Sequence, residues 1–238
     1  MAAHVALNSL AHRNLKVDLR PSADYGDNIG MVGVIPREYG RLVAYYPIFF
    51  RKVGEEGRFE PGAMLGFSND ENLFLANGRW DSLYVPLQFQ RQPFAVWSEG
   101  EGEAAKLTVA IDTESPRLKP TGEAIFLGDG QPTEYLQNVT SALSELAQGA
   151  PVAFAYAAKL DALGLIEPVT LDIEFVDRSQ LKLTGLHSIS REKLLALKAK
   201  QLTELRDAGY LELLYYQLAS MVHVSSLIAR KNKLIAGL

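Results

Sequence analysis

The chain has 238 residues, of which 47% are hydrophobic and 22% are charged, and its formal net charge at pH 7 is −4. These values are typical of a globular protein with a core of its own, and the negative charge argues against nucleic-acid binding through a broad basic surface. The absence of cysteine excludes disulfides, thiolate nucleophiles and cysteine-ligated zinc or iron–sulfur centres.

The amino-terminal stretch MAAHVALNSLAHRNLKVDL lacks the continuous apolar segment of a secretory signal, because polar residues such as Asn8 and Arg13 interrupt it. The longest uncharged apolar-rich run, residues 213–229, is shorter than the roughly 20 residues that a membrane span requires. We therefore expect a cytoplasmic protein without a transmembrane helix, and association with the cell surface stays open.

The first half of the chain, about residues 33–112, has the patterns of β-structure. Residues 42–50 (LVAYYPIFF) are aromatic and β-branched, which favours a strand with Pro47 at its edge or end. Asn77-Gly78 predicts a tight turn. Further strands are expected at residues 63–67, 72–76, 83–94 and 106–112.

The second half, about residues 131–233, is mainly helical by its spacing of apolar residues. Helices are expected at residues 133–148, 152–163, 190–208 and 210–233. Gly149 and Pro151 should separate the first two helices. Residues 169–176 alternate and should form a β-hairpin with the strand that begins at residue 180. The last two helices should pack antiparallel through a leucine seam that includes Leu214 and Leu218.

No motif for catalysis or metal binding is present in the sequence. The four histidines, His4, His12, His187 and His223, lack the spacing of a metal-binding pair, so no metal is expected. Serine-nucleophile, phosphate-loop and dinucleotide motifs are missing too, so we assign no catalytic residue and no cofactor. Carboxylates gather in two loops, at residues 70–71 and 112–123. They are either solvated or, where one is desolvated, suited to acid–base chemistry.

The aromatic residues are concentrated in one region. Residues 45–97 hold more than half of the phenylalanine, tyrosine and tryptophan, including both tryptophans, with prolines and arginines between them. This composition fits an aromatic β core, and it also fits a binding surface, in which Trp, Tyr and Arg are enriched. For the second interpretation we predict a ligand- or partner-binding site formed by Tyr46, Trp80, Tyr84, Arg91 and Phe94.

Several stretches resemble the SapC-like family of bacterial proteins, and together they cover most of the chain after residue 38. They are YYPIFFRK (45–52), GFSNDENLFLANGRWDSLYVPLQFQRQPF (66–94), IDTESPRLKPTGEAIF (111–126) and the long segment 181–227. The resemblance implies an association with surface-array (S-layer) loci. It also implies frequent neighbourhood with flavin-dependent halogenase-like proteins, cupin-type hydroxylases and TonB-dependent receptors. A peptide permease that spans the membrane shares the family's name, but this chain is not expected to have a spanning helix and so is not expected to share the permease's function.

We therefore expect a single α+β domain over residues 1–238, with a β-rich first half and a helical second half that contains one β-hairpin. The expected function is that of a non-enzymatic accessory or binding protein in a bacterial surface-related or peptide- or polysaccharide-processing system. Its partner would be a protein, peptide or saccharide and not a nucleic acid. The alternative is an enzyme acting on a peptide or sugar through an aromatic and carboxylate-lined pocket. A structural S-layer component is a third hypothesis, which the lack of a signal peptide disfavours.

Overall fold

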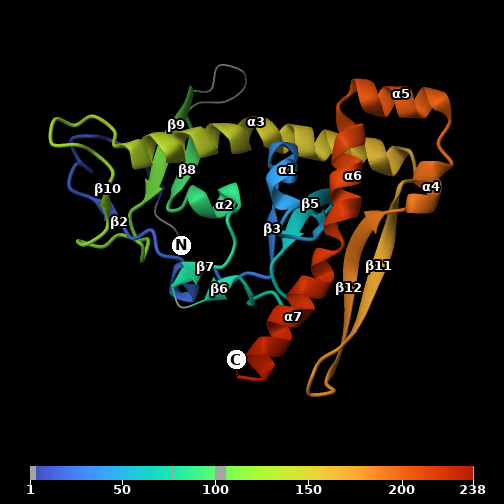
Figure 1. Ribbon diagram of the computed structural model, residues 1–238. Helices are drawn as coiled ribbons and strands as arrows, with labels where there is room; N and C mark the ends of the chain where they lie inside the picture. The colour runs from blue at the N-terminus through green and yellow to red at the C-terminus, as the bar shows by residue number, and fades with distance from the viewer. Residues whose placement is uncertain (1–3, 77, 100–105, 238) are drawn as a thin grey trace. The chain divides into compact units, whose positions relative to one another are not determined.

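The computed structural model describes residues 4–76, 78–99 and 106–237 (Figure 1). Its strands lie mostly in the first half of the chain and its helices mostly in the second, with one β-hairpin among the helices. The fold class is therefore α+β, as predicted. The chain divides into two compact units. The first contains the residues up to Asn28, Leu75–Asp81 and Leu87–Gln148, and the second contains Ile29–Phe74, Ser82–Pro86 and the residues from Gly149 onward. The expectation of a single domain stays a prediction.

The first unit is built around a three-stranded antiparallel sheet with the order β1-β9-β8. These strands are β1 (His4–Ala6), β8 (Phe94–Glu99) and β9 (Lys106–Asp112). Two small ladders accompany the sheet: β2 (Lys16–Val17) with β10 (Glu123–Ala124), and β6 (Leu75–Ala76) with β7 (Arg79–Trp80). The unit also contains the 3-10 turn η1 (Ala23–Tyr25) and the short helix α2 (Leu87–Gln90).

The core of the first unit lies between this sheet and the start of the long helix α3 (Glu134–Ala162). Helical spacing places Leu136, Val139 and Leu143 on one face of α3, where they pack against Phe94 and Ile111 of the sheet. This packing holds strands β8 and β9 against the start of α3.

The second unit contains a five-stranded antiparallel sheet with the order β11-β12-β4-β5-β3. Its strands are β3 (Met31–Gly33), β4 (Ile48–Val53), β5 (Arg58–Met64), β11 (Ile166–Glu174) and β12 (Gln180–Ile189). Around it lie η2 (Pro36–Glu38), α1 (Tyr39–Leu42), α4 (Arg191–Leu195), α5 (Ala199–Asp207), α6 (Tyr210–Ser220) and α7 (His223–Ile235). Aromatic side chains fill its core: the ring of Tyr156 lies 6.0 Å from that of Tyr39 and 5.9 Å from that of Phe50.

The predicted β-hairpin is confirmed, and Figure 1 shows it extending beyond the rest of its sheet. Strand β12 pairs with β4 only at His187, opposite Phe50, so most of the hairpin consists of two strands alone. Two contacts hold its turn in place. The ring of Phe175 packs edge-to-face with that of Phe67 at 5.7 Å between ring centres, and the backbone N–H of Val176 donates to Asn232 Oδ1 at 2.9 Å.

Two strand predictions differ from the structure. The strand expected at residues 42–50 begins only at Ile48, directly after Pro47, and Leu42 belongs to helix α1. Residues 83–94 form helix α2 and a turn, because Pro86 suits the entry to a helix and Pro93 lacks a donor for a ladder. The shorter predictions were displaced: β5 ends at Met64, and β6 covers only residues 75–76. The β6–β7 hairpin confirms a tight turn, with Gly78 at φ 72°, while Asn77 lies outside the described residues.

The helix boundaries also differ from the prediction. Residues 134–162 form one helix with Pro151 inside it, instead of two helices. A Cβ on Gly149 would lie 2.6 Å from Ile35 Cδ1, so this glycine serves close packing within the second unit and not a helix end. The last two predicted helices each divide, into α4 and α5 and into α6 and α7.

The leucine seam lies on a different face from the one predicted. Leu214 is fully buried as expected, but Leu218 is only partly buried, and the polar Gln217 and Ser220 are fully buried instead. Ser220 explains part of the shift, because its Oγ accepts the backbone N–H of Ile48 at 2.9 Å and donates to the carbonyl of Gln217 at 2.7 Å.

Candidate functional site

The five predicted contact residues fall into the two units: Tyr46 and Tyr84 in the second, and Trp80, Arg91 and Phe94 in the first. Tyr46 is fully buried, and its hydroxyl donates to the carbonyl of Tyr84 and contacts Ser82 Oγ. Its ring packs on Phe74 at 4.6 Å. The ring of Tyr46 therefore lies inside the second unit and contributes to its packing.

Tyr84 completes a buried polar arrangement in the second unit. Its hydroxyl donates to Glu38 Oε1 at 2.9 Å, and the Arg41 guanidinium lies 5.5 Å from its ring centre. The other oxygen of Glu38 accepts the backbone N–H of Ile35 at 3.1 Å. Burial and the neighbouring Glu38 raise the pKa of Tyr84 well above its usual range. Tyr84 therefore stays a protonated donor, and its bond to Glu38 holds η2 in place.

The other three predicted residues meet around helix α2. The ring of Trp80 packs on Phe89 of α2 at 4.7 Å. Arg91 follows directly after α2, and its Nη1 donates to the carbonyl oxygen of Phe94 at 2.7 Å. The side chain of Phe94 is fully buried in the core, so only its backbone faces this arrangement. Trp80 thus packs on α2, and Arg91 is bonded to the backbone of Phe94.

A groove of about 320 Å³ opens beside Arg91. Its walls come from α2 and the turn after it, from the start of β8, and from one face of α3. They are formed by Gln88, Arg91, Ala95, Val96, Leu143, Leu146 and Ala147. Two of these residues are polar and the rest are apolar, which is the composition of a ligand site with an orienting polar group.

Among the described residues that line the groove, Arg91 is the only charged one. Its Nε donates to Gln88 Oε1 at 2.8 Å and its Nη1 to Phe94 O, but no carboxylate of the described residues forms an ion pair with it. Partial burial lowers the pKa of Arg91 without a carboxylate to offset the effect. Arg117 is a contrast within the same unit, because its guanidinium forms a buried pair with Asp27. Arg91 is therefore a positioned cation without a counter-ion among residues 4–76, 78–99 and 106–237.

The family model of SapC matches residues 7–227. The chain belongs to the SapC family. No curated protein and no solved structure matches this chain. In this SapC-family member the Arg91 groove lies inside the matched residues, and so do all five predicted contact residues.

The sequence prediction found Arg91 but missed the other walls of the groove. Gln88 and Arg91 are three residues apart, which is the spacing of neighbours on a helix. That signal was obscured because residues 83–94 were expected to form a strand. Leu143, Leu146 and Ala147 lie about fifty residues later in the sequence, and no local pattern connects them to α2.

A second missed feature of this SapC chain is the buried ion pair of Arg117 and Asp27. Arg117 is 5% exposed and Asp27 is 1% exposed, and Arg117 Nη2 donates to both oxygens of Asp27. The remaining donors of Arg117 reach Gln92 Oε1 at 3.0 Å and the carbonyls of Asp18 and Arg20 at 3.2 and 3.3 Å. Every bond of this guanidinium is internal, so we assign it a structural role.

The histidines and carboxylates do not gather into a metal-binding cluster in the described part of the chain. No group of three or more His, Asp or Glu residues there could hold a metal ion. His223 bonds to the carbonyl of Val43 at 2.9 Å, and His187 packs against Phe59 at 4.9 Å. Glu71, from the loop at residues 68–72, pairs with Lys231 of α7 at 2.6 Å. None of the described helices is long and apolar enough to cross a membrane.

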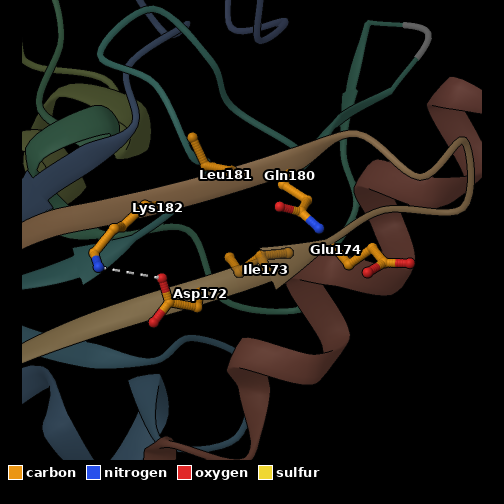
Figure 2. Close-up of a pocket in the computed structure, with 6 residues that line it drawn as sticks. All are labelled: Asp172, Ile173, Glu174, Gln180, Leu181 and Lys182. Carbon is orange, nitrogen blue, oxygen red and sulfur yellow. Dashed lines mark ion pairs between the residues drawn. The ribbon is translucent and has the colours of Figure 1, made fainter.

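A second pocket, of about 420 Å³, lies near the turn of the β11–β12 hairpin (Figure 2). It is lined by Asp172, Ile173, Glu174, Gln180, Leu181 and Lys182. Its charged pair, Lys182 Nζ and Asp172 Oδ1 at 3.8 Å, has side chains that are 71% and 73% exposed. Ion pairs this exposed contribute little free energy, and salt screens them. We therefore place the candidate site at Arg91.

Proposed function

We propose that this SapC-family protein is a non-enzymatic accessory protein that holds a partner through the groove around Arg91. The observation that supports the proposal is the partly buried Arg91 guanidinium, which no described carboxylate neutralises. Taking a cation out of water is unfavourable unless a partner compensates for it. A partner that brings an anionic group into the groove would supply that compensation.

The geometry of Arg91 suits a carboxylate in particular. A guanidinium has five N–H donors, and the hydrogen bonds of Arg91 to Gln88 and Phe94 fix the plane of its guanidinium. A guanidinium held in one orientation can bind a planar carboxylate through two parallel bonds. The apolar walls beside it, Leu143 and Leu146 among them, provide contact area without competing hydrogen bonds.

The family resemblance and the groove together support one class of partner. The proposal is a protein or peptide partner in a bacterial surface-related or peptide- or polysaccharide-processing system. A flavin-dependent halogenase-like protein and a cupin-type protein are the first candidates. We place this action in the cytoplasm, so that any association with the cell surface or an S-layer runs through the partner.

The proposal can be tested by affinity purification from the native cell, with the retained proteins identified by mass spectrometry. Arg91→Gln should reduce recovery of the specific partner by about tenfold, because Gln retains a donor for Phe94 O but not the charge. Arg191→Gln is the matched control, since Arg191 is exposed and lies in α4. Equal partner recovery by Arg91→Gln and the parent, with both folded by circular dichroism, would refute the proposal.

A further inference from the structure

The groove beside Arg91 runs along an open edge of a β-sheet. Strand β8 is the last strand in the order β1-β9-β8, and it pairs only with β9 among the described residues. An edge strand presents backbone N–H and C=O groups that another strand can use. The residues of β8 whose backbone groups point outward follow from its register with β9.

The register assigns the outward positions to Phe94 and Val96. The backbone N–H of Asp112 donates to the carbonyl of Pro93 at 3.1 Å, so Pro93 is in a hydrogen-bonded position opposite Asp112. Because these positions alternate in an antiparallel pair, Ala95 and Trp97 bond to β9, and Phe94 and Val96 face away from it.

Arg91 already bonds to the backbone of Phe94, which is the first outward position. The backbone N–H of Phe94 donates to the carbonyl of Arg91 at 2.8 Å, and the carbonyl of Phe94 accepts from the Arg91 guanidinium at 2.7 Å. Val96 is the next outward residue, and its side chain is 40% exposed and forms part of the groove wall. The open part of the edge therefore begins directly beside the cation.

The geometry points to β-strand addition: an extended segment of the partner pairs with the outer edge of β8 and places an acidic side chain on Arg91. This inference rests on the proposed function and names its ligand as an acidic, unfolded peptide segment. Main-chain bonds to an edge supply affinity in such complexes, and alternate side chains supply specificity. Successive side chains of a strand alternate between faces. The residue two positions from the acidic one should therefore be apolar, because it would lie on Val96 and Leu146.

Val96→Pro tests the role of the strand edge separately from that of the Arg91 cation. Val96→Pro removes an outward N–H but no bond to β9, and proline is tolerated on an edge strand where its N–H would face solvent. Ala6→Pro is its matched control on β1, at the opposite edge of the same sheet. There the bond from the Leu7 N–H to Val109 O at 2.8 Å makes Ala6 an outward residue.

The probe is a display library of random peptides of about ten residues, which exceeds a typical strand of about 5–6 residues. We expect the selected peptides to share an acidic residue with an apolar residue two positions away. Binding of a selected peptide, measured by fluorescence anisotropy, should weaken by about tenfold or more when that acid becomes its amide. N-methylation of alternate peptide amides, Arg91→Gln and Val96→Pro should each have the same effect, and Ala6→Pro should have none.

The outcomes distinguish this inference from the proposed function. If Arg91→Gln abolishes binding while Val96→Pro and N-methylation leave it intact, the groove binds the partner but strand addition is wrong. If no peptide is enriched, or enriched peptides bind the Arg91→Gln protein equally well, the inference fails whether or not partner recovery in cells depends on Arg91. A dimer that forms without peptide and is lost in Val96→Pro would identify a second copy of the chain as the occupant and overturn the acidic peptide.

Discussion

Replacing Asp27 with Asn should destabilise the first unit strongly. The change keeps the size of the side chain but removes the charge that faces Arg117, and these side chains are 1% and 7% exposed. Removal of one partner of a buried ion pair costs about 3–5 kcal/mol, because it leaves the other charge uncompensated. Arg117 keeps its bonds of 3.0–3.3 Å to Gln92 and two carbonyls, so we expect the lower end, about 3 kcal/mol.

Tryptophan fluorescence during urea unfolding can measure this loss in the right part of the molecule. Trp80 and Trp97 are the two tryptophans of the chain, and both belong to the first unit. A loss of about 3 kcal/mol corresponds to a fall in melting temperature of about 6–12 °C for a protein of this size. Asp172→Asn is the control, since its partner Lys182 lies 3.8 Å away on the surface. A loss below about 1 kcal/mol for Asp27→Asn would show that the buried pair does not have the role assigned to it.

Three further predictions concern packing, a buried hydrogen bond and pH. Leu214→Ala should lower the free energy of unfolding by about 2–5 kcal/mol in chemical denaturation, because Leu214 is fully buried. Leu218→Ala should lower it clearly less, because Leu218 is only partly buried. A larger loss for Leu218→Ala than for Leu214→Ala would support the seam expected from the sequence. Ser220→Ala should cost about 1–3 kcal/mol because a backbone N–H of β4 loses its acceptor, whereas unchanged melting by circular dichroism would show that another group replaces it. Hydrogen bonds from Arg20 lower the pKa of Asp18 well below its usual range, so its stabilising effect is present above about pH 4 and is lost as the pH falls further. Asp18→Asn should therefore flatten the acid side of the stability curve, and an unaltered acid transition would contradict this assignment.

The parts of the fold that sequence predicted correctly are those with a local signal. Strict alternation identified the hairpin from residue 169 and the strand at 106–112, and Gly209 at φ 73° ended a helix as predicted. The errors arose where tertiary packing overrides the local pattern. From the sequence alone Gly149 is expected to end a helix, because the sequence does not reveal that Ile35 packs against it.

The candidate site was predictable only in part, for the same reason. The composition of residues 45–97 singled out Arg91, but Tyr46 and Phe94 share that composition and are fully buried. Aromatic content does not distinguish a core from a surface, because both use large apolar rings. The groove itself depends on Leu146 and Val96 lining the same hollow and on the strand order that leaves β8 at an edge, and both are long-range relationships.

The long β-hairpin has a consequence for the dynamics of the second unit. An isolated pair of strands has only marginal stability in water, and β12 is joined to β4 at a single residue pair. The free energy of opening residues 169–185 should therefore depend on a few contacts, namely the burial of Ile173, the packing of Phe175 on Phe67 and the bond from Val176 to Asn232. Loss of the Asn232 carboxamide would then speed amide hydrogen exchange along the hairpin while the exchange of β4 and the global unfolding transition stay the same, so the hairpin would open and close as a cooperative unit of its own.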